Sequence, residues 1–132
     1  GVWRPPDGPL PAKLNFLLGK LLDLLEEVHP TAVSVETVFA AKNVASAVKL
    51  SHARGVLLAA AARHEIPVFE YEPRLVKKAL VGYGQAEKPQ VRSMVLTLLA
   101  RERDHVPLDA ADALAVAICH IHSPNSAVPG SR

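Results

Sequence analysis

The chain has 132 residues, of which 49% are apolar and 21% are charged, a balance typical of one globular domain with a sizeable core. Its formal net charge of +2, from 15 basic and 13 acidic side chains, is too small to indicate a nucleic-acid partner by itself. A single cysteine, Cys119, excludes an intrachain disulfide and favours a reducing compartment such as the cytoplasm. No apolar run reaches the roughly 18 residues of a membrane-spanning helix and no signal peptide is evident, so we expect no membrane partner.

The pattern of apolar residues predicts helices that alternate with two strands. Residues 1–11 read as a proline-rich loop, and leucines at helical spacing predict a helix from Ala12 to Val28. The stretch Thr31–Asn43 begins as a strand, and a second strand covers Ile66–Glu70. Strands separated by helices indicate an α/β fold in which helices cover a sheet. The remaining helices are predicted over residues 45–64, 73–81, 87–100 and 108–122, followed by a flexible tail at 123–132.

Glu36 is the unusual residue of the first predicted strand. Its neighbours Val33, Val35 and Val38 are β-branched and apolar, which favours a buried strand with Glu36 in its middle. An unpaired buried carboxylate costs several kcal/mol, so such a residue usually has a partner, a metal ion or a shifted pKa. The alternative is that Glu36 lies at a strand end and faces water. The local sequence leaves both interpretations open.

Two further carboxylates, Asp109 and Asp112, lie three residues apart at the start of the last predicted helix. This spacing places both on one side of the helix. Asp109 as the N-cap and Asp112 as a first-turn acid would explain the pair without any ligand. The neighbouring Ala110 and Ala111 favour a helix start that is packed inside the protein. Together with Glu36, the pair has the oxygen ligands that Mg²⁺ prefers, and two such ions can cleave a phosphodiester.

Basic residues gather around the predicted glycine turn at 82–84. Three of them share one helix face before the turn, and two lie at or near the start of the next helix. They could bind a phosphate backbone, but most such runs of charge are solvated surface, which is the alternative that the local sequence favours. The five residues are Arg74, Lys77, Lys78, Lys88 and Arg92.

The predicted helix from Ala45 to His64 is rich in alanine and glycine. Small side chains allow a close approach of another helix, which suits either a dimer interface or packing onto the sheet. The helix pattern alone does not separate these alternatives.

Three blocks of the sequence resemble the RuvC-type Holliday-junction resolvases of bacteria. They are ETVFAAKNVASAVKLSHARG at Glu36–Gly55, VFEYEPRLVKKALVGYGQAEKPQV at Val68–Val91 and DAADALAVAICH at Asp109–His120. The resemblance implies an RNase H-like mixed sheet flanked by helices, and a homodimer formed through the 45–64 helix. It also implies a cytoplasmic endonuclease of homologous recombination and DNA repair, which nicks four-way junction DNA symmetrically with Mg²⁺ or Mn²⁺, two ions per active site. A branch-migration helicase complex is the further partner it implies.

The resemblance also assigns roles to individual residues. It places the family's catalytic, metal-binding carboxylates on Glu36, Asp109 and Asp112, and an aromatic that stacks on DNA on Phe39. Lys77 and Lys88 match basic residues at the DNA, and the further DNA-binding candidates are Lys42, Arg74 and Arg92.

The sequence departs from the family at its beginning. Family members open with a strand that carries an Ile-Asp-Pro-Gly-type motif, whose Asp is the first catalytic ligand, and nothing in Gly1–Pro11 matches it. We therefore expect residues 1–122 to be an N-terminally incomplete resolvase domain that lacks the first strands. The chain would then be a fragment of a nuclease or, alternatively, a dimeric junction-binding or interaction module without catalysis. We favour the fragment because the other carboxylates and the basic residues are intact.

Overall fold

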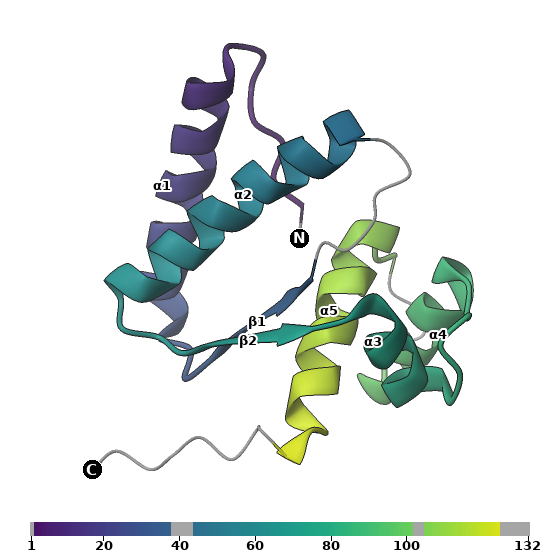
Figure 1. Cartoon of the computed structure of the whole chain (residues 1–132). Coiled ribbons are helices and arrows are strands. Elements are labelled where there is room, and N and C mark those ends of the chain that lie inside the picture. Colours follow the sequence, from purple (N-terminus) through teal and green to yellow (C-terminus); the bar gives the residue numbers. More distant parts are fainter. Residues whose placement is uncertain (1, 38–43, 102–104, 125–132) are drawn as a thin grey trace. The chain divides into compact units, whose positions relative to one another are not determined.

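A computed structural model describes residues 2–37, 44–101 and 105–124. Every predicted helix and strand is present, with ends that differ from the predicted ones by a few residues. The elements are α1 (Leu10–Val28), β1 (Val33–Glu36), α2 (Val44–Arg63), β2 (Val68–Tyr71), α3 (Pro73–Val81), α4 (Lys88–Leu98) and α5 (Leu108–Ile121) (Figure 1). None of the helices in these described stretches is long and apolar enough to cross a membrane.

The two strands form a parallel pair. The Val33 N–H donates to Pro67 O at 2.9 Å, and four residues later the Thr37 N–H donates to Tyr71 O at 2.9 Å. This constant offset fixes the register, and a parallel connection requires a long crossover, which α2 supplies. The α/β prediction is therefore confirmed: a small parallel sheet has helices before, between and after its strands.

The chain divides into two compact units, which we describe separately. The carboxylate unit contains Ser34–Thr37 and the described part of Phe69–Arg132. The helix-pair unit contains Trp3–Val33 and the described part of Val38–Val68. The unit names refer to the acidic residues of the first and to α1 and α2 of the second.

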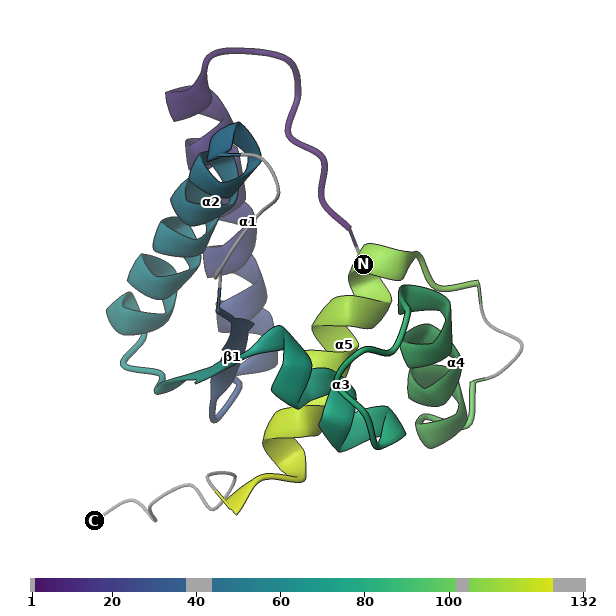
Figure 2. The ribbon, with the colours of Figure 1, turned by 45° about the vertical axis from the view of Figure 1, so that its right-hand side comes forward.

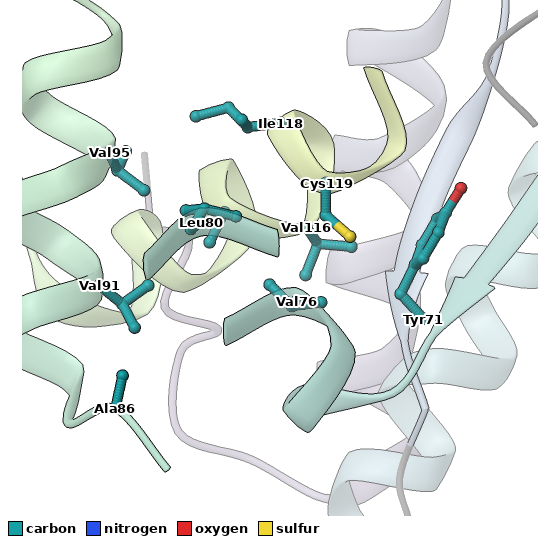
Figure 3. Close-up of a cluster of buried hydrophobic side chains, with 10 residues drawn as sticks. Tyr71, Val76, Leu80, Ala86, Val91, Val95, Val116, Ile118 and Cys119 are labelled. Atoms are coloured by element: carbon teal, nitrogen blue, oxygen red, sulfur yellow. The ribbon is translucent and has the colours of Figure 1, made fainter. Parts of the chain in front are cut away.

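The carboxylate unit has a well-packed core. Helices α3, α4 and α5 pack against one another, and Tyr71 from β2 completes the cluster (Figure 3). Val95 of α4 is completely buried, and Cys119 of α5 is a buried free thiol whose pKa is raised by burial. The buried members are Tyr71, Val76, Leu80, Ala86, Val91, Val95, Ala115, Val116, Ile118 and Cys119.

A tight glycine turn joins α3 to α4 in this unit. Gly82 ends α3 with a left-handed φ of 87°, and its N–H donates to Lys78 O at 3.0 Å. Gly84 passes close to the start of α3, where an added Cβ would lie 3.2 Å from Arg74 O. The next helix begins with a capping box, in which the Glu87 N–H donates to the Gln90 side chain at 2.9 Å. The turn and the box together fix where α4 starts.

The helix-pair unit is packed less completely. Helices α1 and α2 lie against each other in both views (Figure 1 and Figure 2). Leu25 of α1 and Ala60 and Ala61 of α2 are buried, whereas Val44 of α2 is 80% exposed. Between the helices and the start of β1 lies a cavity of about 240 Å³, lined by Leu21, Leu24, Leu25, Val28, Pro30, Ala32, Val33, Leu57 and Ala61.

The structure decides two points that the sequence left open. Glu36 is not in the middle of a strand but is the last residue of β1, and it is exposed. Asp109 is not the N-cap of α5, because Pro107 occupies that position and Leu108 begins the helix. The backbone of Pro107 is extended, with φ −57° and ψ 149°, which is the non-helical geometry of an N-cap, so Asp109 is the second residue of α5. The carboxylate of Asp109 is therefore left free for other partners.

Candidate active site

Glu36 is held at the end of β1 by the pairing of the two strands. Both the N–H and the hydroxyl of the next residue, Thr37, donate to Tyr71 O, at 2.9 and 3.3 Å. Val35, on the opposite face of the strand, is buried. The strand end is thus anchored on both sides of Glu36, while the carboxylate itself remains accessible.

Asp109 and Asp112 lie on the first turns of α5. Ala110 and Ala111 between them are buried, which anchors the start of the helix in the carboxylate unit. The side chain of Asp109 is 84% exposed and that of Asp112 is 34% exposed. The expectation of a packed helix start is therefore confirmed for the alanines, and the aspartates face outward from it.

One ammonium group joins the two aspartates. Lys88 Nζ lies 2.6 Å from Asp112 Oδ2, a hydrogen bond, and 3.7 Å from Asp109 Oδ1. Lys88 is the first residue of α4, and the packing of α4 on α5 brings it to the aspartates across 21 and 24 positions of sequence. The prediction that both carboxylates lie on one side of α5 is confirmed by this shared partner.

The charges of these groups act on one another. Partial burial raises the pKa of the Glu36 carboxyl, and the negative charge of Asp112 adds to that rise, whereas Lys88 and Lys77 oppose it. The hydrogen bond to Asp112 raises the pKa of Lys88, and the carboxylates of Asp112, Asp109 and Glu36 act in the same direction against a smaller effect of burial. Glu36, Asp109, Asp112, Lys77 and Lys88 therefore form one electrostatic group, which we call the carboxylate site.

The carboxylate site attracts a cation, as its contact with an ammonium group demonstrates. Oxygen ligands of this kind suit Mg²⁺ and similar hard ions. Within the described residues, no three His, Cys, Asp or Glu side chains are close enough together to hold one ion. Asp109 and Asp112 thus provide a pair of ligands on one helix, and Glu36 contributes charge from the strand.

A buried polar network, which no local pattern of residues indicates, lies at the other end of α5. Tyr71 Oη is 2.7 Å from His120 Nδ1 and 3.0 Å from Ser123 Oγ. The His120 ring also packs against Phe69, with ring centroids 4.5 Å apart. His120 is the one buried polar residue among the described parts of the chain. The network connects β2 to the end of α5, so it holds in place the helix that carries the two aspartates.

The predicted DNA-binding residues do not all lie in one place in the structure. Lys77 of α3 is half-buried and its charge reaches Glu36, so it belongs to the carboxylate site together with Lys88. Arg74 is exposed on α3 and Arg92 is half-buried on α4. Two of the candidates, Phe39 and Lys42, lie outside the described residues.

The chain is similar to known proteins over most of its length. The family model "Crossover junction endodeoxyribonuclease RuvC" matches residues 1–120. The chain belongs to the RuvC family of crossover junction endodeoxyribonucleases. The RuvC of Alkaliphilus metalliredigens is 49% identical over 113 residues, which are 86% of this chain and 69% of that protein. The RuvC of Legionella pneumophila is 47% identical over 128 residues, which are 96% of this chain and 73% of that protein.

Solved structures of the family have the same fold. Thermus thermophilus RuvC superimposes with a TM-score of 0.80 at 35% identity, covering 90% of this chain and 72% of that one. The same protein in complex with Holliday junction substrate gives a TM-score of 0.85 at 33% identity, covering 96% of this chain and 77% of that one. The fold class and family predicted from the sequence are therefore confirmed.

Proposed function

We propose that this chain is a structure-selective endonuclease that resolves four-way DNA junctions, with Glu36, Asp109 and Asp112 as its catalytic carboxylates. One observation carries the assignment of the site. In a member of a junction endonuclease family, two of the carboxylates that the resemblance singles out, Asp109 and Asp112, contact one cation, Lys88 Nζ, and the charge of the third, Glu36, acts on the same group. Carboxylates that share a cation are what a metal-dependent nuclease needs.

The carboxylate site fits a divalent cation, and we infer that this is Mg²⁺ or Mn²⁺. Asp109 and Asp112 would hold it, and Glu36 would face it from the strand. The contact between Lys88 and the aspartates supports this inference, because the ammonium is a stand-in for a cation there. When bound, such an ion supplies Lewis-acid stabilisation of the phosphate that is cleaved, and the family resemblance implies a second ion. The rigid start of α5 orients the two aspartates before the ion arrives.

We infer that basic residues around the carboxylate site neutralise DNA phosphates. Lys77 is supported by the effect of its charge on Glu36, and Arg74 by its exposure on α3. Lys88, Arg92 and Lys42 are further candidates, and Phe39 is the candidate for stacking on an opened base. Removing one phosphate contact should weaken binding and make the salt dependence of log K shallower by about one unit.

We also infer that the protein acts as a homodimer through α2. Val44, Val48 and Leu50 lie in the first half of this helix and are 80%, 48% and 55% exposed, an apolar surface that suits burial against a second chain. Two subunits would provide the two active sites that symmetric nicking requires.

A cytoplasmic location and a branch-migration helicase partner are further proposals. They rest on the single reduced cysteine and on the family resemblance, respectively.

The test is cleavage of a labelled four-way junction in Mg²⁺, with a linear duplex of the same sequence as the competing substrate. It should use this chain and, in parallel, the chain together with any coding sequence that precedes Gly1. We expect selective, paired nicks, and a loss of at least about 100-fold in Glu36→Gln and Asp112→Asn, the scale of removing one charged group from such a centre. The matched control is Asp23→Asn, which alters an exposed acid of α1.

Three results would contradict the proposal: unchanged nicking by Asp112→Asn, equal cleavage of the linear duplex, or junction binding without any nicking by the chain extended with the coding sequence that precedes Gly1. The last is what the non-catalytic junction-binding alternative predicts. None of our observations favours that alternative.

A further inference from the structure

Lys88 occupies a position that its predicted role does not explain. The sequence places it among residues that contact DNA, yet its ammonium lies 2.6 Å from Asp112 Oδ2 and 3.7 Å from Asp109 Oδ1. An ammonium engaged with two carboxylates has little charge left for a phosphate. The contact also covers the same oxygens that a divalent cation would need.

The position of Lys88 is fixed by the fold. Lys88 is the first residue of α4, directly after the capping box of Glu87 and Gln90 and before Pro89, whose ring sets the backbone of the first turn. Helix α4 then packs on α5, where buried Val91 and Val95 contribute to the common core. The start of α4 is therefore held close to the start of α5, and the ammonium returns to the aspartates whenever they are free.

The local charge balance shows what would follow if a divalent cation replaced the Lys88 ammonium at the carboxylates. Three carboxylates, Glu36, Asp109 and Asp112, interact with two ammonium groups, Lys77 and Lys88. If Lys88 leaves, the carboxylates face Lys77 alone, and the excess of two negative charges matches one divalent cation. Lys88 is 55% exposed, so its long side chain has room to swing toward solvent or a ligand.

We propose that Lys88 is a resident counter-ion of Asp109 and Asp112, which a divalent cation displaces, so that metal entry releases the ammonium toward a DNA phosphate. This inference rests on the proposed function, because it takes Asp109 and Asp112 as the metal ligands. It adds a regulatory role: Lys88 keeps the empty carboxylate pair neutralised and links metal occupancy to the positive charge offered to DNA. Lys88 competes with the metal at the carboxylates and does not bind it.

The first experiment measures Mn²⁺ affinity by calorimetric titration of the DNA-free protein. Lys88→Met removes the ammonium and keeps an unbranched side chain only one atom shorter. We expect it to bind Mn²⁺ about three- to tenfold more tightly, because a partly exposed competing ion pair is lost. Lys78→Met, an equal charge change at an exposed position of α3, should alter the affinity less than about twofold. Lys88→Arg retains the charge and can pair with carboxylates through its planar guanidinium, so it should bind Mn²⁺ no more tightly than the unaltered protein.

The titration separates two kinds of failure. If Lys88→Met binds Mn²⁺ no more tightly than Lys78→Met, while Asp109→Asn and Asp112→Asn weaken binding, the counter-ion role is wrong and the proposed metal ligands stand. If the two Asn variants bind Mn²⁺ as the unaltered protein does, both the ligand assignment and the counter-ion role are wrong.

A second experiment follows Lys88 directly. Acetylation of lysines by a water-soluble ester, read by mass spectrometry, reports how free each ammonium is. Saturating Mg²⁺ should raise the modification rate of Lys88 at least about twofold, because the ion pair that protects it is broken, and should leave Lys78 unchanged. A Lys88 rate that stays constant or falls while Mg²⁺ binds would overturn the proposal.

Discussion

The two units of the chain differ in how completely they bury their apolar side chains. The carboxylate unit packs α3, α4 and α5 around residues such as Val95, which is completely buried, and places its charges at the outer edge. The helix-pair unit leaves a cavity of about 240 Å³ and apolar side chains such as Val44 in the open. A precise arrangement of charged groups needs rigid support, whereas an open apolar surface suits contact with another protein. This difference in packing supports the two proposals made above, catalysis by the carboxylate unit and dimerisation through α2.

The largest expected effect comes from a leucine-to-alanine substitution made once in each unit, which tests this difference in packing. Leu80→Ala removes a buried side chain from the core of the carboxylate unit and should lower the free energy of unfolding by about 2–5 kcal/mol. Leu24→Ala, at a 40% exposed position that lines the cavity, should cost less than about 1 kcal/mol. Urea denaturation measures both values, and equal losses would show that the two units are packed alike.

The second-largest expected effect on stability comes from the polar network at the end of α5. Tyr71→Phe removes the hydroxyl that contacts His120 Nδ1 and Ser123 Oγ, and the buried imidazole loses its partner. We expect a loss of about 1–3 kcal/mol in unfolding free energy, the cost of leaving a buried polar group unsatisfied. Tyr83→Phe at an exposed position is the matched control and should change stability by less than about 0.5 kcal/mol. A similar loss in both variants would mean that the network does not anchor α5.

Filling the cavity of the helix-pair unit should have a smaller effect of opposite sign. Ala32→Val adds two methyl groups at the half-buried position that precedes β1 and lines the cavity. We expect thermal unfolding to shift upward by an amount that corresponds to about 0.5–1 kcal/mol. A downward shift would show that the cavity walls have no room for the added methyl groups.

The smallest predicted effect concerns the pH dependence of Glu36. Because burial raises the folded-state pKa of this carboxyl above its ordinary value of 4.5, the folded protein holds the proton more tightly than the unfolded chain does. Ionised Glu36 therefore lowers stability, increasingly as the pH rises through the folded-state pKa. Glu36→Gln should stabilise the metal-free protein at pH 7 by less than about 1 kcal/mol, since water screens this exposed residue.

The same variant should show no gain well below pH 4.5, where the Glu36 carboxyl is protonated in both the folded and the unfolded state. Thermal unfolding in a chelating buffer at several pH values measures the difference. A Gln variant that is less stable than the unaltered protein at pH 7 would mean that Glu36 is stabilised by its basic neighbours and not strained by burial.

Local patterns in the sequence were sufficient for the elements of the fold. The leucines of α1 and the proline at the start of α3 identify helices because helical spacing and fixed backbone angles act over a few residues. Ends were less certain, since they depend on tertiary contacts. Glu36 is the last residue of β1, next to Thr37, which donates to Tyr71 O, and Asp109 is not the N-cap because α5 already begins at Leu108, directly after Pro107.

The acidic residues of the carboxylate site were predicted from the sequence, but the contact of Asp109 and Asp112 with Lys88 was not. Asp109 and Asp112 share one helix face, which the sequence displays directly. Lys88 meets them only because the glycine turn and the capping box set the start of α4 beside α5, and no local pattern encodes that approach. The contact between Tyr71 and His120, 49 residues apart, escaped prediction for the same reason.

The position of a bound metal ion tests the central proposal most directly. Crystals of the protein grown with Mn²⁺ can be measured at a wavelength where manganese scatters anomalously. We expect an anomalous peak within about 2.5 Å of oxygens of Asp109 and Asp112, with Lys88 Nζ moved away from its 2.6 Å contact. An ion bound elsewhere, or an ion at the aspartates with Lys88 still in place, would contradict the proposed site in the first case and the proposed exchange in the second.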